Sequence, residues 1–206
     1  ITAAKTASAM SDPLDDFDFS EHTNGNYFLH TGNGQQGWPS MGAWFAYGLG
    51  TECQDLPGFI VLDGGLIPPG GLDNFNSGFL PATYQVYFQF QRPAAGEYQA
   101  IESSDVLQRN KLDLLDKLDA GVLERIGHVD QLEAAIANYE LAYRMQAVVP
   151  ELTDLSDESS ATVEMYGLHT KTKGTATFGR QCLLARRLAE RGVRFIELTC
   201  PSIGHD

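Results

Sequence analysis

The side chains best suited to chemistry in this sequence are five histidines, set among many carboxylates. They are His22, His30, His128, His169 and His205. No pair has the H-E-x-x-H or H-x-H spacing of a metal site, and the chain contains neither a G-x-S-x-G elbow nor a P-loop. Local motifs therefore do not establish hydrolase or NTPase chemistry.

The last residues hold the most suggestive pair, His205 and Asp206, shortly after a strand-like run. In α/β sheets, functional groups gather at the carboxyl ends of the strands. Imidazole and carboxylate groups suit zinc and the harder divalent cations. The pair predicts a metal site that is incomplete in this chain, and a solvated tail is the alternative.

A glycine-rich segment, Gly32-Asn-Gly34-Gln-Gln-Gly37, matches the G-x-G-x-x-G pattern of dinucleotide-binding loops. Its context is poor, because the preceding residues are too polar for a central strand and Pro39 starts the next helix after the third glycine. A tight turn that leads into a helix explains the same residues.

Two early elements would position such groups. A helix is expected over 39–47, with Pro39 near its start and Gly48 and Gly50 at its end. The apolar run 59–63 is typical of a strand buried on both faces, which favours a parallel sheet. Residues 63–81 hold five Gly and three Pro among large apolar side chains, so we expect a packed loop or a contact between subunits. The alternation over 84–90 predicts a short strand.

Helical periodicity follows from residue 103 to 151 and predicts two helices, broken at Gly127, with the second stopped by Pro150. Tyr139 and Tyr143 are expected in the core of the second helix. A third helix over 180–191 should pass through Gly192 directly into a strand over 193–199, as in layered α/β folds.

The basic side chains of this third helix gather on one side. Arg180, Arg187 and Arg191 fall on one helical face. A solvated face is favoured there over anion recognition.

Composition limits the possible partners. The chain has 206 residues, 43% of them hydrophobic and 20% charged, which suits one globular domain. Its net charge of −13 disfavours nucleic acid, and no run is long and apolar enough for a membrane span. The three cysteines lack metal or disulfide spacing and predict buried free thiols. Five acids at 11–21 indicate a solvated arm, with Ca²⁺ binding as a weaker alternative.

Seven phrases, in order, resemble one protein family. They are HTNGNYFLHTG at 22–32, PSMGAW at 39–44, YGLG at 47–50, LPGF at 56–59, NSGFLPA at 76–82, YELAYRMQ at 139–146 and CLLARRLAERGVRF at 182–195. The family is the bacterial domain-of-unknown-function family 1501, abundant in planctomycetes and grouped with alkaline phosphatases and sulfatases. The resemblance covers about residues 20–206.

The resemblance implies an α/β fold, an alkaline-phosphatase-like three-layer sandwich that is incomplete at both ends. Residues 1–20 would be a weakly matching, flexible arm and 21–206 a partial domain. We expect a fragment of an exported or periplasmic protein that is longer at both ends. The isolated fragment should be inactive.

In metal-dependent relatives of this clan, a metal-bound Ser, Thr or formylglycine attacks the phosphorus or sulfur of an ester. The resemblance therefore implies a divalent metal ion (Ca, Zn or Mg) in the full-length parent and none in this fragment. The expected ligand is a small sulfate or phosphate ester, with carbohydrate as a further ligand class.

The resemblance implies that His30, Thr31, Gly32 and Ser40 lie beside the substrate and that His205 and Asp206 lie next to the metal-ligand segment. No catalytic residue is assigned. The alternative is a non-catalytic binding or structural protein on the same scaffold, using the 63–81 loop for a partner or a glycan.

Overall fold

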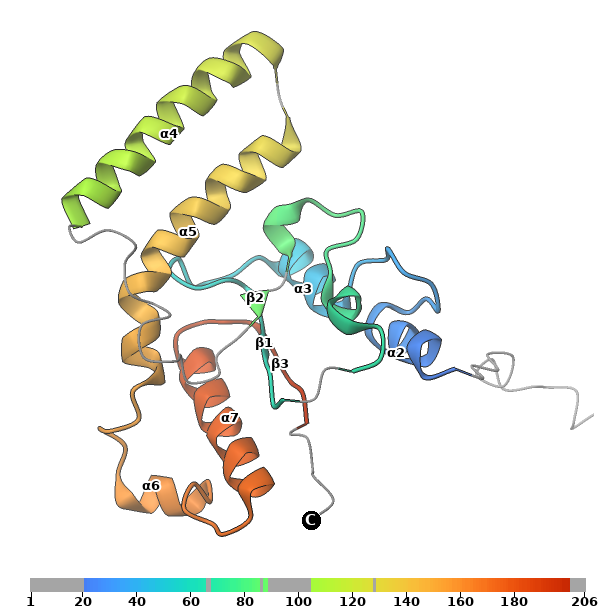
Figure 1. Cartoon of the computed structure of the whole chain (residues 1–206), viewed down its shortest axis with the longest axis vertical. Coiled ribbons are helices and arrows are strands. Elements are labelled where there is room, and N and C mark those ends of the chain that lie inside the picture. Colours follow the sequence, from blue (N-terminus) through green and yellow to red (C-terminus); the bar gives the residue numbers. More distant parts are fainter. Residues whose placement is uncertain (1–20, 66–67, 86, 89–104, 128, 201–206) are drawn as a thin grey trace, which may run out of the picture.

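The computed structural model describes residues 21–65, 68–85, 87–88, 105–127 and 129–200. Within these ranges the helices are α2 (His22–Thr31), α3 (Met41–Leu49), α4 (Asp105–Ile126), α5 (Asp130–Thr153), α6 (Ser160–Met165) and α7 (Lys173–Glu190). The strands are β1 (Phe59–Leu62), β2 (Tyr87–Phe88) and β3 (Phe195–Leu198), and two short 3₁₀ helices are η1 (Gly71–Phe75) and η2 (Ala82–Tyr84). The fold is mixed α/β (Figure 1).

A small parallel sheet with the order β2-β1-β3 lies at the centre. All four residues of β1 are buried, which confirms the strand expected from the apolar run. Phe59 pairs with Phe195 and Leu62 with Leu198, so β1 and β3 end side by side. Of the strand predicted over 84–90, Tyr87–Phe88 pair with β1, whereas Tyr84 ends η2. Residues 86, 89 and 90 lie outside the described residues.

Helices cover both faces of the sheet, because successive side chains of a strand point to opposite faces. Phe59 and Val61 pack with Ala46 of α3 and Phe75 of η1. On the opposite face, Ile60 and Leu62 join a second cluster. Its members from α5 and α7 are Val149, Leu152, Leu184 and Leu188. In Figure 1, α7 and the lower half of α5 lie on one side of the strands, and α3 lies on the other.

Helix α7 enters β3 through Gly192, as the sequence predicts. The expected solvated face of arginines is wrong. Arg187 Nη1 donates to the carbonyl of Leu152 at 2.9 Å and also contacts the Asp154 carbonyl, while Arg191 Nη2 lies 2.8 Å from a Glu151 carboxylate oxygen. The Arg187 guanidinium donates to carbonyls at the end of α5 that have no partner within the helix. The positive charges of both arginines also offset the partial negative charge at this end of the helix.

Pro150 does not end α5, which continues to Thr153. Proline removes one helical hydrogen bond. The helix nevertheless buries Leu152 completely in the core beyond the proline, and the Asp154 N–H donates to the Pro150 carbonyl at 3.1 Å. Burial of a leucine contributes about 1.5–3 kcal/mol, which offsets much of this cost.

Helices α4 and α5 form a long hairpin that projects from the sheet (Figure 1). Arg109 connects them, with Nη1 3.3 Å from Glu140 Oε2 and its guanidinium 5.6 Å from the Tyr143 ring centroid. The core position expected for Tyr139 is wrong, because its side chain is 57% exposed. Tyr143 is half-buried against Arg109 rather than in the core.

The 63–81 segment packs against the rest of the fold, which agrees with the expectation of a packed loop. Asn74 and Phe75 are fully buried, and the Ser40 N–H donates to the Asn76 carbonyl at 2.9 Å. Two apolar members, Leu72 and Phe79, remain exposed. Residues 66–67 lie outside the described residues.

Two expectations from composition concern the cysteines and membranes. Cys53, Cys182 and Cys200 are free thiols. Cys53 and Cys182 are half-buried and Cys200 is exposed, so the expectation of three buried thiols is wrong. Across the described ranges, none of the helices combines the length and the apolar character that a membrane span requires.

We predict that Gly42→Ala destabilises the protein, because a Cβ at this position in α3 would lie 2.4 Å from the Phe59 ring on β1. Overpacking of this kind costs about 1–3 kcal/mol. Gly48→Ala is the matched control on the same helix: nothing lies within 4 Å of its added Cβ. That variant should be neutral or more stable by about 0.5–1 kcal/mol. Urea unfolding followed by circular dichroism measures both, and equal stability of the two variants would contradict the close approach.

Candidate functional site

The carboxyl ends of β1 and β3 bring together polar groups from distant parts of the chain. The Thr199 N–H donates to the Leu62 carbonyl at 3.0 Å, and the Gly64 N–H donates to Thr199 Oγ1 at 2.9 Å. Thr199 Oγ1 also lies 3.3 Å from Asp63 Oδ1. A carboxylate and a hydroxyl therefore meet at the edge of the sheet where α/β proteins usually place their sites.

His30 reaches the same sheet from the last turn of α2. Its Nδ1 lies 3.1 Å from Glu197 Oε1 on β3, with the two side chains 13% and 24% exposed. The ring packs edge-on against Phe75, with centroids 4.8 Å apart. Among the described residues, this ion-pair contact with Glu197 is the polar contact that the His30 ring makes. One nitrogen of this imidazole is therefore fixed by a carboxylate, and Nε2 is left for other chemistry.

Thr31 and Gly32 end α2. Thr31 Oγ1 lies 2.7 Å from the Tyr27 carbonyl and accepts from the Asn33 N–H at 3.2 Å. Gly32 adopts a φ of 73°, and its N–H donates to the Phe28 carbonyl at 2.8 Å. These contacts set the direction of the turn that follows His30.

Ser40 caps the N-terminus of α3 and is 2% exposed. Its Oγ accepts from the Ala43 N–H at 3.2 Å and donates to the Phe75 carbonyl at 3.2 Å. Phe75 therefore touches His30 through its ring and Ser40 through its carbonyl. The structure brings these two predicted substrate residues to one place, with the Ser40 hydroxyl already engaged.

The predicted metal ligands His205 and Asp206 lie outside the described residues. In the part of the chain that the structure covers, no three His, Cys, Asp or Glu side chains gather closely enough to hold a metal ion. His30, Glu197 and Asp63 thus do not form a metal centre by themselves. Their imidazole and carboxylate groups are of the donor types that Zn²⁺, Mg²⁺ and Ca²⁺ accept.

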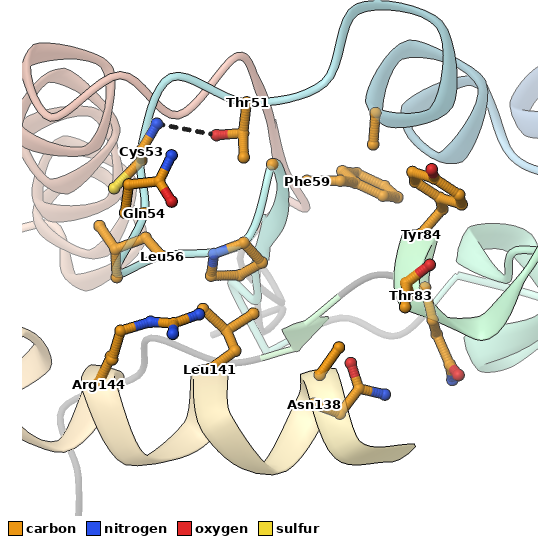
Figure 2. A pocket seen from close by; sticks show the side chains of 15 residues that line it. Thr51, Cys53, Gln54, Leu56, Phe59, Thr83, Tyr84, Asn138, Leu141 and Arg144 are labelled. Atoms are coloured by element: carbon orange, nitrogen blue, oxygen red, sulfur yellow. Dashed lines mark hydrogen bonds between the residues drawn. The ribbon is translucent and has the colours of Figure 1, made fainter. Parts of the chain in front are cut away.

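A cavity of about 220 Å³ lies at the opposite end of β1 (Figure 2). It is enclosed by the 51–59 segment, η2 and α5, with Phe59, Leu141 and Arg144 among its lining residues. The backbone N–H of Cys53 donates to Thr51 Oγ1 at 3.1 Å in its wall. Of the predicted site residues that the structure describes, His30, Thr31, Gly32 and Ser40, none lines this cavity. It therefore lies apart from the His30–Glu197 edge.

A comparison with protein-family models matches residues 9–206 to a protein of unknown function, DUF1501. The chain belongs to this family. The match to DUF1501 begins at residue 9, just before the acidic segment 11–21, and runs to residue 206. Neither the curated proteins nor the solved structures provide a match to this DUF1501 chain.

Sequence reasoning missed several residues that organise this DUF1501 site. Gln181 of α7 is 4% exposed, and its Nε2 donates to the carbonyls of Leu62 and Thr199 at 2.8 and 3.2 Å. It thereby ties together the ends of β1 and β3. Glu197 carried a usable signal, because it is the single charged residue within β3. A charge in a half-buried strand favours a partner of opposite charge.

We predict that neutral His30 carries its proton on Nδ1, because the Glu197 carboxylate can only accept a hydrogen bond. Long-range ¹H–¹⁵N correlation spectra should show protonated Nδ1 and unprotonated Nε2, with His30→Gln identifying the signal among the five histidines. Glu197→Ala should shift the ring towards the Nε2-protonated form. A wild-type ring protonated on Nε2 alone would contradict this assignment of the proton.

Proposed function

We propose that this DUF1501 chain is part of a metal-dependent hydrolase that cleaves sulfate or phosphate esters. We also propose that its fold is an alkaline-phosphatase-like three-layer α/β/α sandwich. The fold proposal is supported by the parallel sheet with helices on both faces. The observation that carries the activity is the His30–Glu197 pair on a strand whose carboxyl end meets that of β1. The sequence resemblance to sulfatase-like proteins supports the reaction class.

His30 is the residue best placed to handle a proton. Its Nδ1 lies 3.1 Å from Glu197 Oε1, a contact that orients the ring and leaves Nε2 as the nitrogen that can face a substrate. Ester hydrolysis requires a proton on the departing oxygen, and a positioned histidine supplies one. We therefore assign His30 as the acid that protonates the leaving group through Nε2, with Glu197 as its positioning residue.

A bound divalent metal ion would stabilise negative charge on the ester oxygens. The described residues supply too few clustered ligands for it, so the proposal requires further donors, with His205 and Asp206 the first to test. In line with the resemblance, we also propose that the protein acts after export. Its substrate would be a small ester outside the cytoplasm.

We predict that the complete gene product, purified with its native metal, hydrolyses an aryl sulfate or aryl phosphate and loses activity on chelation. His30→Gln should lower kcat by about 10²–10⁴-fold, the usual contribution of a general acid. KM should change less, because the side chain acts on the leaving group. His169→Gln is the matched control, because His169 is an exposed histidine on the connection between α6 and α7.

Elemental analysis of the same preparation tests the metal. Stoichiometric Zn, Mg or Ca that is lost in His205→Ala or Asp206→Ala would support both assignments. A complete gene product that holds no metal and turns over no ester would overturn the hydrolase proposal, and equal activities of His30→Gln and His169→Gln would remove the role of His30.

A further inference from the structure

Helix α3 buries its small residues and exposes its large ones, which reverses the usual order in soluble proteins. Gly42, Ala43 and Ala46 face β1, whereas Trp44 and Tyr47 are 44% and 52% exposed. The close approach of α3 to the Phe59 ring explains the small residues. It does not explain the outward aromatic residues, so these must serve another purpose.

The outward rings belong to a continuous aromatic strip of five side chains. Trp38 lies 5.7 Å from Phe79, Phe79 lies 5.8 Å from Trp44, Trp44 lies 6.0 Å from Tyr47, and Tyr47 lies 5.3 Å from Tyr84, all between ring centroids. Trp38 and Phe79 are 43% and 63% exposed. A connected exposed patch of this kind marks a binding surface.

A polar hollow of about 450 Å³ adjoins the Trp38–Phe79 end of the strip. Gln36, Asp73, Asn76, Ser77 and Gln85 contribute side chains to it. Asp73 holds two of the amides, because Gln36 Nε2 donates to Oδ2 at 2.5 Å and Asn76 Nδ2 donates to Oδ1 at 2.7 Å. Among the described residues, neither side-chain carbonyl of these two amides has a hydrogen-bond partner. The hollow therefore presents an ordered set of acceptors and donors.

Gly78 fixes the rings beside the hollow. A Cβ on Gly78 would lie 2.5 Å from the Pro39 nitrogen, and its φ is 55°. The 37–39 and 77–79 backbones consequently pack directly together, which places Trp38 and Phe79 side by side. The surface is organised before any ligand binds, which reduces the entropy that binding must overcome.

These features select a ligand with apolar ring faces and a rim of hydroxyl groups. The C–H groups of a pyranose pack against the electron-rich faces of aromatic rings, and its adjacent hydroxyls match a carboxylate flanked by amides. The Asp73 carboxylate and the net charge of −13 repel phosphate and sulfate groups at this position. The volume of the hollow falls within the usual range of small-ligand sites.

We propose that the hollow and the aromatic strip bind a neutral oligosaccharide. One sugar ring sits at Asp73 with its face on Trp38 or Phe79, and the chain of sugars continues over Trp44 and Tyr47. This proposal does not rest on ester hydrolysis, because it requires neither metal nor turnover.

Intrinsic fluorescence tests the proposal directly, because the two tryptophans of the sequence are Trp38 and Trp44, both in the strip. The chain is titrated, with chelator present, against neutral hexasaccharides of glucose, mannose, galactose and xylose. At least one should shift the emission saturably, and calorimetry should give the same affinity. Phe79→Ala and Asp73→Asn should each weaken that affinity about tenfold or more. Phe178→Ala, which removes a 43% exposed ring from α7, should leave the affinity unchanged.

Three results would overturn the proposal. The first is that no hexasaccharide binds to a chain whose cooperative melting shows that it is folded. The second is that Phe79→Ala and Asp73→Asn bind as well as Phe178→Ala does. The third is that ultracentrifugation shows self-association that Phe79→Asp abolishes, because the strip would then be an interface between two copies. Loss of ester turnover with retained sugar affinity would count against the hydrolase proposal alone.

Discussion

The burial of β1 on both faces is the constraint on which the rest of the structure depends. Its four residues expose at most 1% of their surface, so helices must cover both sides and a strand must pair along it. On one side α3 comes close enough that only glycine fits over Phe59. On the other, α5 and α7 supply Leu152, Leu184 and Leu188. The carboxyl ends of β1 and β3 are thereby held at a fixed separation, which is the condition for any chemistry built there.

Polar contacts then join the separate parts of the chain at this edge. Gln181 satisfies the last carbonyls of two strands from within α7, and Glu197 binds His30 of α2 from the middle of β3. The Gln181 amide nitrogen and the Glu197 carboxylate thereby have partners, as polar groups in or near a core require, whereas Gln181 Oε1 has no hydrogen-bond partner among the described residues. The turn after α2 is consequently anchored to the sheet, and Phe75 connects it further to the start of α3.

The same helix, α3, links the two proposed surfaces. Its N-terminus is capped by Ser40 next to the His30 turn, whereas its outer face carries the aromatic strip. An ester-cleaving edge and a sugar-binding surface would therefore be coupled through one rigid element.

The sequence by itself determined the buried strand 59–62 and the passage from α7 through Gly192 into β3, because periodicity and turn residues are local signals. It also determined that a helix lies near 39–47, whereas the structure placed its bounds at Met41–Leu49, after the Ser40 cap. It also determined the family, through phrases that the comparison with DUF1501 supports. The tertiary structure decided that α5 runs past Pro150, that Arg187 binds the end of α5, and that Tyr139 stays outside the core. It also decided that His30 meets Glu197 and that five rings form one strip. Those outcomes depend on contacts between residues far apart in the chain, and neither spacing nor composition records which distant surfaces will meet.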